Sequence, residues 1–377
     1  WEKQILLPMS QPKRSCGQKI QNKENGMEQT KRMDNLDLMK ALGILMVITI
    51  HVPLWKPEFM ETDSVGRLVQ YAFRIISEGV PIFVTINGLL LLKKKNMCLK
   101  THVEKMLRLF LVLILWGGVL AVVGMHLDNN VDTFTLKDVL RAVLNIQVGA
   151  QYTGVLWFLQ NLLAVYLVYP LLWYLFNEKY GFYEYLFGVV TAFVLGLRTL
   201  GFLRDILSTR FDTEMLSRCI DFLYRLNPIG NGWYVFYFML GGIMWHYLDA
   251  IKSNRVLLGV LGILSWPAVF GLAYYISVST GATYDPSFNY GSIFMVAFIL
   301  GMFALTIQFE NRNALTRVVC SVGKNTLGMY LGHYLFIFLI YHFWNVEKMQ
   351  ERILAYLAVC IGSYVLSLVL NPLLKKI

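Results

Sequence analysis

One membrane-length apolar run contains both a histidine and a lysine. The segment LDLMKALGILMVITIHVPLW covers residues 36–55, with Lys40 near its start and His51 near its far end. Eleven residues of α-helix separate the two side chains, which therefore lie within roughly 20° of one face and ~16 Å apart along the axis. An imidazole inside a bilayer is costly unless it faces a cavity and has a chemical task. His51 is therefore our first candidate for a catalytic residue, and imidazole suits proton transfer near neutral pH.

Polar groups near this histidine allow a functional and a structural interpretation. His51 could instead be a hydrogen-bonded core histidine, while Lys40 reaches the interface and pairs with Asp37, three residues before it. The next apolar run reads YAFRIISEGVPIFVTINGLLLLKKK and contains Glu78. Glu78 could orient His51 and stabilise its protonated form, or it could pair with Arg74 four residues away.

Two cations and a second histidine complete the set of candidate residues. Lys105 and Arg108 are three residues apart at the start of an apolar run, so they share a helix face. They could bind the phosphates of a polyanionic molecule, although basic clusters also arise from membrane topology alone. Tyr330 and His333 share a face near the C-terminus, whereas His342 falls on the opposite side. No cysteine or histidine spacing is typical of a metal site, so we predict none.

Composition determines the kind of elements that must position these residues. The chain has 377 residues, is 56% hydrophobic and 15% charged, and has a mean hydropathy of +0.51. A soluble protein of this length could not bury so much apolar surface. We predict an all-α integral membrane protein, a single bundle of about ten transmembrane helices. Their predicted ranges are 36–55, 70–92, 104–126, 155–177, 183–200, 229–249, 255–277, 290–309, 325–345 and 352–374, with a short amphipathic segment at a surface over 135–148.

Charge placement predicts the orientation and the domain limits. Residues 1–33 form a basic tail that we expect to be disordered, and residues 1–26 could precede the native start. Residues 34–377 form the membrane domain. Lysines and arginines gather on the side of the N-terminus, which predicts that both termini are cytoplasmic; the connection 198–228 is long and carries charges of both signs. The formal net charge of +10 therefore reflects topology, and we expect no nucleic acid partner.

Six segments, in order along residues 34–372, resemble the membrane-bound acyltransferase 3 family. Lys40-x10-His51 after NLDLM resembles its basic-x10-His signature, with lysine where arginine is commoner. The other five are SEGVPIFVTINGLLLLKKK, which has Asn87 where serine is commoner, VEKMLRLFLVLILWG with Lys105 and Arg108, VLWFLQNLLAVYLVYPLL with Trp157, GWYVFYFMLGGIMW, and GKNTLGMYLGHYLFI with His333 at the family's second histidine.

This resemblance implies a multi-pass plasma membrane enzyme that works in the lipid bilayer. Such an enzyme transfers an acyl group, usually acetyl from acetyl-CoA, to a hydroxyl or amine of an extracytoplasmic glycan or related acceptor. His51 would be the general base, supported by Glu78, while Lys105, Arg108 and Lys40 would bind the donor. Lys40 lacks the planar fork with which arginine binds phosphate. Residues expected to contact substrate or support the site are Asp37, Asn87, Trp157, Tyr330 and His333. The alternative function is a transporter or flippase for a polysaccharide or lipid-linked sugar, without acyl transfer.

Overall fold

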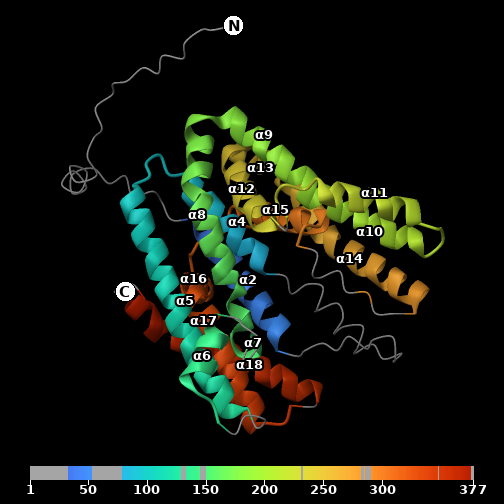
Figure 1. Ribbon diagram of the computed structural model, residues 1–377. Coiled ribbons are helices and arrows are strands. Elements are labelled where there is room, and N and C mark those ends of the chain that lie inside the picture. Colours follow the sequence, from blue (N-terminus) through green and yellow to red (C-terminus); the bar gives the residue numbers. More distant parts are fainter. Residues whose placement is uncertain are drawn as a thin grey trace. The chain divides into compact units, whose positions relative to one another are not determined.

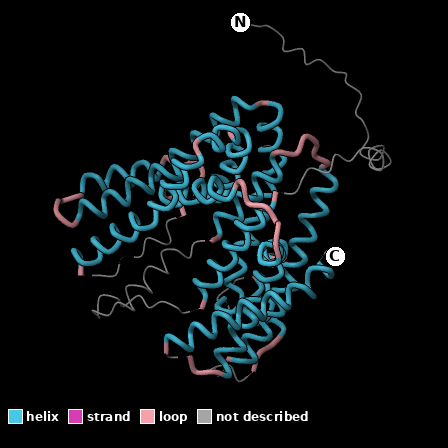
Figure 2. The backbone as a smooth tube through the Cα atoms, turned by 180° about the vertical axis from the view of Figure 1, so that it is seen from behind, coloured by secondary structure: helices cyan, strands magenta, loops and turns pink. Residues whose placement is uncertain are grey.

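The computed structural model describes residues 33–52, 79–128, 133–144, 150–230, 232–281, 284, 290–346 and 348–374. The chain divides into two compact units, Trp1–Met33 and Asp34–Ile377. All regular elements of the described residues are helical, which confirms the predicted all-α class (Figure 2). Residues 1–32 of the tail predicted over 1–33 lie outside these residues.

Figure 1 labels most of the helices of the second unit. Their bounds are α2 Asp34–His51, α4 Val80–Leu92, α5 Leu99–Leu127, α6 Leu136–Val143, α7 Ala150–Thr153, η2 Gly154–Leu156, α8 Trp157–Glu178, α9 Tyr180–Thr191, η3 Ala192–Gly196, α10 Leu197–Ser208, α11 Glu214–Arg225, α12 Trp233–His246, α13 Leu248–Ser253, α14 Arg255–Thr280, α15 Ile293–Thr306, α16 Ala314–Lys324, α17 Thr326–Phe343 and α18 Met349–Leu374.

Six helices within the described residues are long and apolar enough to cross a membrane, fewer than the ten that were predicted. They are Leu99–Leu127, Gln151–Glu178, Tyr180–Ser208, Arg255–Thr280, Thr326–Phe343 and Gln350–Pro372. Helices α4 and α15 are apolar but shorter than a typical span, because α4 begins only at Val80 and α15 ends at Thr306. The protein is thus a multi-pass membrane protein.

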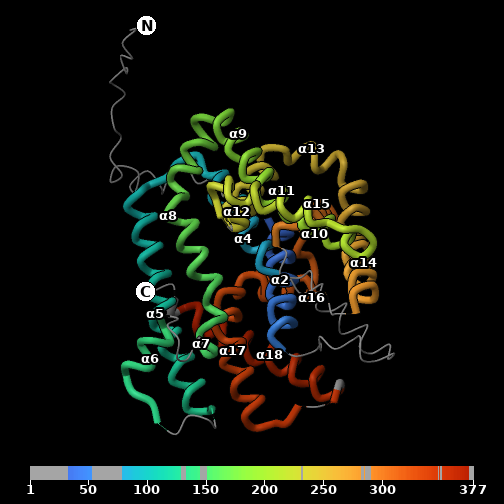
Figure 3. Tube along the Cα trace, turned by 45° about the vertical axis from the view of Figure 1, so that its right-hand side comes forward, coloured from blue at the N-terminus to red at the C-terminus, as the bar shows by residue number. Residues whose placement is uncertain are grey.

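The predicted long connection 198–228 is largely helical in the structure. The helix that begins at Tyr180 passes through a π-helical turn, η3, and continues as α10. Figure 3 shows α10, α11 and α14 near one another, and α10 contacts both of the others. Charges in this segment pair locally, Arg204 with Asp205 at 2.6 Å and Arg218 with Glu214 at 2.5 Å. Local pairing lets a charged sequence stay helical without a long loop.

Glycines bring the backbone of α4 into contact with two neighbouring helices. A Cβ on Gly88 would lie 1.9 Å from the carbonyl oxygen of Phe238 in α12, and one on Gly241 would lie 2.1 Å from the carbonyl oxygen of Thr85. Gly79, at the start of α4, meets Gly43 of α2 in the same way. Small residues allow such close approach between membrane helices, where packing replaces the hydrophobic effect. The short helix α4 is therefore held by α2 and α12.

Helices α5 and α17 run parallel, and two hydrogen bonds fix their register. The indole Nε1–H of Trp116 donates to the carbonyl of Leu331 at 2.7 Å. Eleven residues further along both helices, Nδ1 of His342 lies 2.8 Å from the carbonyl oxygen of Leu127. Residues of α5 and α17 that these bonds pair therefore lie at the same level along the two helix axes.

Gly88→Ala should destabilise the protein, because the new methyl group would overlap the carbonyl of Phe238. Overpacking typically costs about 1–3 kcal/mol, and a backbone neighbour cannot rotate away. Thermal unfolding in detergent should start at a lower temperature than in the wild type. Gly118→Ala is the matched control, because a Cβ there meets nothing within 4 Å. Equal unfolding temperatures for both variants would mean that α4 and α12 are not in backbone contact.

Candidate active site

Two imidazoles from distant parts of the chain meet inside the membrane unit. His51 is the last residue of α2, and His333 lies in α17. Their ring centroids are 5.3 Å apart at an interplanar angle of 42°. Tyr334 packs its ring edgewise on His51 at 5.1 Å. The structure thus brings two predicted site residues together, and it adds a tyrosine that sequence reasoning did not single out.

His333 is held in one tautomer. Its Nδ1 lies 2.5 Å from the carbonyl oxygen of Tyr330, and because a carbonyl can only accept, Nδ1 carries the hydrogen. Nε2 then has a lone pair, and it has no hydrogen-bond partner among the described residues. His333 is 0% exposed, whereas His51 is partly exposed. A buried acceptor without a partner is unfavourable by about 1–3 kcal/mol, so this atom is poised to accept a hydrogen bond.

Neighbouring helices hold the turn that carries His333. The Tyr330 hydroxyl donates to the carbonyl of Val155 in η2, directly before α8. Phe158 packs on the Tyr330 ring with centroids 5.4 Å apart, and Trp116 binds the adjacent Leu331 carbonyl. Tyr330 is therefore a positioning residue for the imidazole, which agrees with the face it was predicted to share with His333.

A cationic cluster lies where α4 ends and α5 begins. Lys93 places Nζ 5.0 Å from the centre of the Trp245 ring, and the Trp173 indole donates to the carbonyl of Lys94 at 2.6 Å. Burial lowers the pKa of Lys93 and, together with the charges of Lys105 and Lys93, lowers the pKa of Lys94. The ammonium groups thus repel one another, and a bound polyanion would relieve this repulsion.

Lys105 and Arg108 extend this cluster along α5. Both side chains are exposed, and neither makes a salt bridge to a described residue. Lys105 precedes Trp116 by eleven residues, which puts the two within roughly 20° of the same face and ~16 Å apart along the axis, and Arg108 precedes Trp116 by eight residues, or ~12 Å. Because Trp116 binds Leu331, the two cations lie about those distances along α5 from the turn of His333.

Lys40 is engaged with its neighbour Asp37. The Nζ–Oδ1 distance is 3.4 Å, and the Asp37 side chain is 2% exposed. Ligand atoms of Asp34, Asp37 and Cys320 lie within 4.8 Å of one another, close enough for a metal ion. However, Asp37 already binds Lys40, and Asp34 accepts a hydrogen bond from the backbone N–H of Asn311. These groups therefore have structural partners, and the binding role predicted for Lys40 stays a prediction.

Other predicted site residues lie at different places in the unit. Asn87 donates to the carbonyl of Phe83 at 2.9 Å and accepts from the Tyr166 hydroxyl at 3.3 Å, which gives it a helix-packing role. Trp157 begins α8 and packs against two further aromatic rings, outside the imidazole pair. Glu78 lies outside the described residues, so its predicted support of His51 has no structural account.

Comparison with known proteins identifies one relationship. A family model described as an acyltransferase domain, that of the acyltransferase 3 family, matches residues 33–371. Comparisons with curated proteins and with solved structures find no match.

Lys105→Gln should raise the pKa of Lys94, because removing one positive charge stabilises the neighbouring ammonium. The pKa can be followed by NMR titration of isotope-labelled methyl groups attached to lysine, with the signal of Lys94 assigned from its loss in Lys94→Arg. Lys252→Gln is the matched control, because Lys252 pairs with Asp249 at 2.8 Å. An unchanged pKa of Lys94 in Lys105→Gln would mean that the two groups do not form one cluster.

Proposed function

The chain belongs to the acyltransferase 3 family, and from this we propose that it transfers an acetyl group from acetyl-CoA to a hydroxyl of a glycan across a membrane. The observation that carries the proposal is the imidazole pair, His51 and His333, placed roughly 12–16 Å along α5 from the cations Arg108 and Lys105. The imidazoles suit proton transfer, and the cations suit binding of the phosphates of acetyl-CoA.

The donor binds at the cationic end in this proposal. Lys105 and Arg108 contact the phosphates of acetyl-CoA, and Lys94 adds a third positive charge beside them. Arginine can bind a phosphate with two parallel N–H donors, whereas lysine supplies a point charge. The N-terminus of α5 lies next to these cations and carries a partial positive charge that also favours an anion. The extended pantetheine arm then brings the thioester up beside α5 toward the imidazoles.

His51 is the general base of the proposed reaction. It is the accessible member of the pair, because the His333 ring is sealed from any substrate at 0% exposure. His51 takes the proton of the acceptor hydroxyl while that oxygen attacks the thioester carbonyl. A new C–O ester bond forms, the C–S bond breaks, and the proton passes from His51 to the leaving thiolate, giving free CoA.

His333 is a positioning residue in this scheme. Its Nε2 lone pair can accept a hydrogen bond from an N–H of His51, since the rings are neighbours and Nδ1–H is already bound to Tyr330. Such a bond orients His51 and stabilises its protonated form after the hydroxyl loses its proton. His51 and His333 do not form this hydrogen bond in the structure. Catalytic hydrogen bonds often form only after the substrate has bound.

The positions of the cations and of the imidazole pair also give the proposed orientation of the protein in the membrane. We place the cationic end at the cytoplasm, where acetyl-CoA is found, and both termini on that side, as the positive-inside rule predicts. His51 then lies nearer the outer face of the plasma membrane, where a surface glycan supplies the acceptor hydroxyl.

His51→Ala should lower the rate of acetyl transfer by about 10²–10⁴-fold, the usual contribution of a general base. Membranes with each variant would receive labelled acetyl-CoA, and the label in the glycan fraction would be counted. His246→Ala is the control, because His246 ends α12 and stacks on the Tyr180 ring, apart from the imidazole pair. Full activity of His51→Ala would remove the proposed base, and no consumption of acetyl-CoA by the wild type would favour a transporter.

His333→Phe should lower kcat by about tenfold while KM for acetyl-CoA changes little, because the variant removes an interaction made only as charge develops on His51. Phenylalanine fills the volume of the imidazole but offers no acceptor. His333→Gln keeps an acceptor oxygen and should recover part of the activity. If both variants lost the same activity, His333 would act by packing alone.

A further inference from the structure

Arg352 is a buried cation that the chain leaves without a counter-charge. It lies in the first turn of α18, and 8% of its surface is exposed. Within the part of the chain that the structure describes, its Nε has no hydrogen-bond partner and its guanidinium forms no salt bridge. The neighbouring Glu351 accepts instead from the backbone N–H of Lys348 at 2.9 Å. A buried charge without a partner is strongly unfavourable, so a bound anion would be favoured here.

The position of Arg352 at a helix start makes its charge still less favourable. The N-terminus of a helix carries a partial positive charge, which disfavours a cation and favours an anion. An arginine close to a helix end usually extends toward the membrane interface, where water solvates its charged group. Arg352 stays buried instead. The fold thus holds a guanidinium where both its own helix and the surrounding protein disfavour it.

A second polar group without a partner lies beside this arginine. The hydroxyl oxygen of Tyr341, near the end of α17, is buried and has no hydrogen-bond partner among the described residues. Arg352 is near enough for its charge to act on this hydroxyl. A guanidinium has five N–H donors and a phenol has one O–H donor. Such donors together suit the oxygens of a carboxylate or a phosphate, which an arginine can bind with two parallel bonds.

Helix geometry places Tyr341 beyond the imidazole pair, on the side away from the cations of α5. Tyr341 follows Tyr334 by seven residues, so the two lie within roughly 20° of one face of α17 and ~10.5 Å apart along the axis. Tyr334 packs on His51. Because α5 and α17 run parallel, the start of α5 and Tyr341 lie on opposite sides of His333 along the helix axes. Tyr341 and Arg352 therefore lie on the side from which the acceptor approaches in the proposed reaction.

The face of α18 that carries Arg352 packs against α2, the helix that ends at His51. Tyr356 lies one turn after Arg352 on the same face. Its hydroxyl donates to the carbonyl of Leu45 in α2 at 3.3 Å. The three helices α2, α17 and α18 contact one another, and each of them carries one of the groups discussed here. An acceptor can therefore present one group to His51 and another to Arg352.

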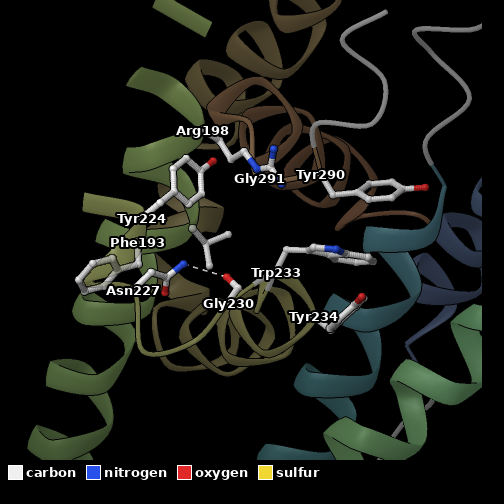
Figure 4. Close-up of a pocket in the computed structure, with 10 residues that line it drawn as sticks. Phe193, Arg198, Tyr224, Asn227, Gly230, Trp233, Tyr234, Tyr290 and Gly291 are labelled. Carbon is white, nitrogen blue, oxygen red and sulfur yellow. Dashed lines mark hydrogen bonds between the residues drawn. The ribbon is translucent and has the colours of Figure 1, made fainter. Parts of the chain in front are cut away.

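The pocket in Figure 4 is a separate feature of the protein. It has a volume of about 180 Å³ and lies between η3, α10, α11 and the start of α12, with Arg198 on one side and the Tyr224 hydroxyl near it. Neither Tyr341 nor Arg352 lines this pocket. Arg198 already has an interaction partner, so its charge gives no reason to expect an anion there.

We propose that Arg352 and Tyr341 bind an anionic group of the acceptor, a carboxylate or a phosphate carried by the glycan. This proposal rests on the proposed acetyl transfer, because it assigns a property of the acceptor of that reaction. Arg352 holds the acceptor and takes no part in the proton transfer at His51. The ~10.5 Å between the levels of Tyr334 and Tyr341 separates the anionic group from the hydroxyl that reacts, so the acceptor is elongated.

Binding can be measured on the full-length protein in nanodiscs of phosphatidylcholine, a lipid without net charge. The probes are methyl glucuronide, the phosphate ester of methyl glucoside, and neutral methyl glucoside. The wild type should bind the anionic probes more tightly by about 10–100-fold, the range for hydrogen bonds to a charged group. Arg352→Gln should remove this preference, and Arg352→Lys, which keeps the charge but lacks the planar fork, should recover part of it. Arg218→Gln is the matched control, because Arg218 is exposed and pairs with Glu214.

Thermal unfolding gives a second test, which does not depend on acetyl transfer. Without probe, Arg352→Met should unfold at a higher temperature than the wild type, because an apolar side chain replaces an unpaired buried charge. Methyl glucuronide should raise the unfolding temperature of the wild type but not that of Arg352→Met. If the Arg352 variants fail to fold, Tyr341→Phe removes only a hydroxyl and should weaken anionic binding severalfold.

Four results would overturn the site: no binding of the anionic probes by the wild type, equal binding of neutral and anionic probes, an unchanged preference in Arg352→Gln, or a lower unfolding temperature of Arg352→Met. Phosphatidylglycerol that displaced the probes from the wild type would assign the site to a lipid headgroup and overturn its role with the acceptor. His51→Ala should bind the anionic probes normally. A wild type that bound them selectively without transferring acetyl would contradict the proposed function alone.

Discussion

The hydrogen bond from His333 to the carbonyl of Tyr330 is the interaction on which the candidate site depends. It fixes the hydrogen on Nδ1 and leaves an acceptor at Nε2, next to the more accessible ring of His51. Trp116 of α5 donates a hydrogen bond to the Leu331 carbonyl of the same turn. The Tyr330 hydroxyl of this turn donates to the carbonyl of Val155 in η2, directly before α8. Three helices therefore determine the orientation of one imidazole, which is what proton transfer at a defined atom requires.

A membrane imposes the separation between the two chemical parts of the protein. Charged side chains are costly inside a bilayer, and Lys94, Lys105 and Arg108 lie after the end of α4 or in the first three turns of α5. An imidazole can be neutral, and it can therefore lie deeper at a smaller cost. The parallel pair α5 and α17 connects the two parts, because one helix begins among the cations and the other carries His333. A long, thin donor molecule suits this arrangement better than a compact one.

Sequence patterns predicted the parts of the protein that depend on local chemistry. Long apolar runs identified helices such as α5 and α14, and the spacing of Asp37 and Lys40 predicted their ion pair. Bent and short helices were harder to predict from the sequence. The π-helical turn η3 lets a helix continue into a charged segment, and the position of α4 depends on glycine contacts with other helices. The tautomer of His333 and its contact with His51 join distant segments, and no periodicity encodes such a contact.

Two hydrogen bonds, one in the middle of α5 and one at its C-terminal end, resist sliding of α5 past α17. Sliding one helix past the other by a single residue is a shift of ~1.5 Å, and it would break the bonds of Trp116 and His342 together. Inside the apolar layer the released Trp116 indole would find no replacement acceptor, so sliding of the two helices is unfavourable. A conformational cycle that admits a bulky molecule and releases it again is therefore easier when other helices move around this pair.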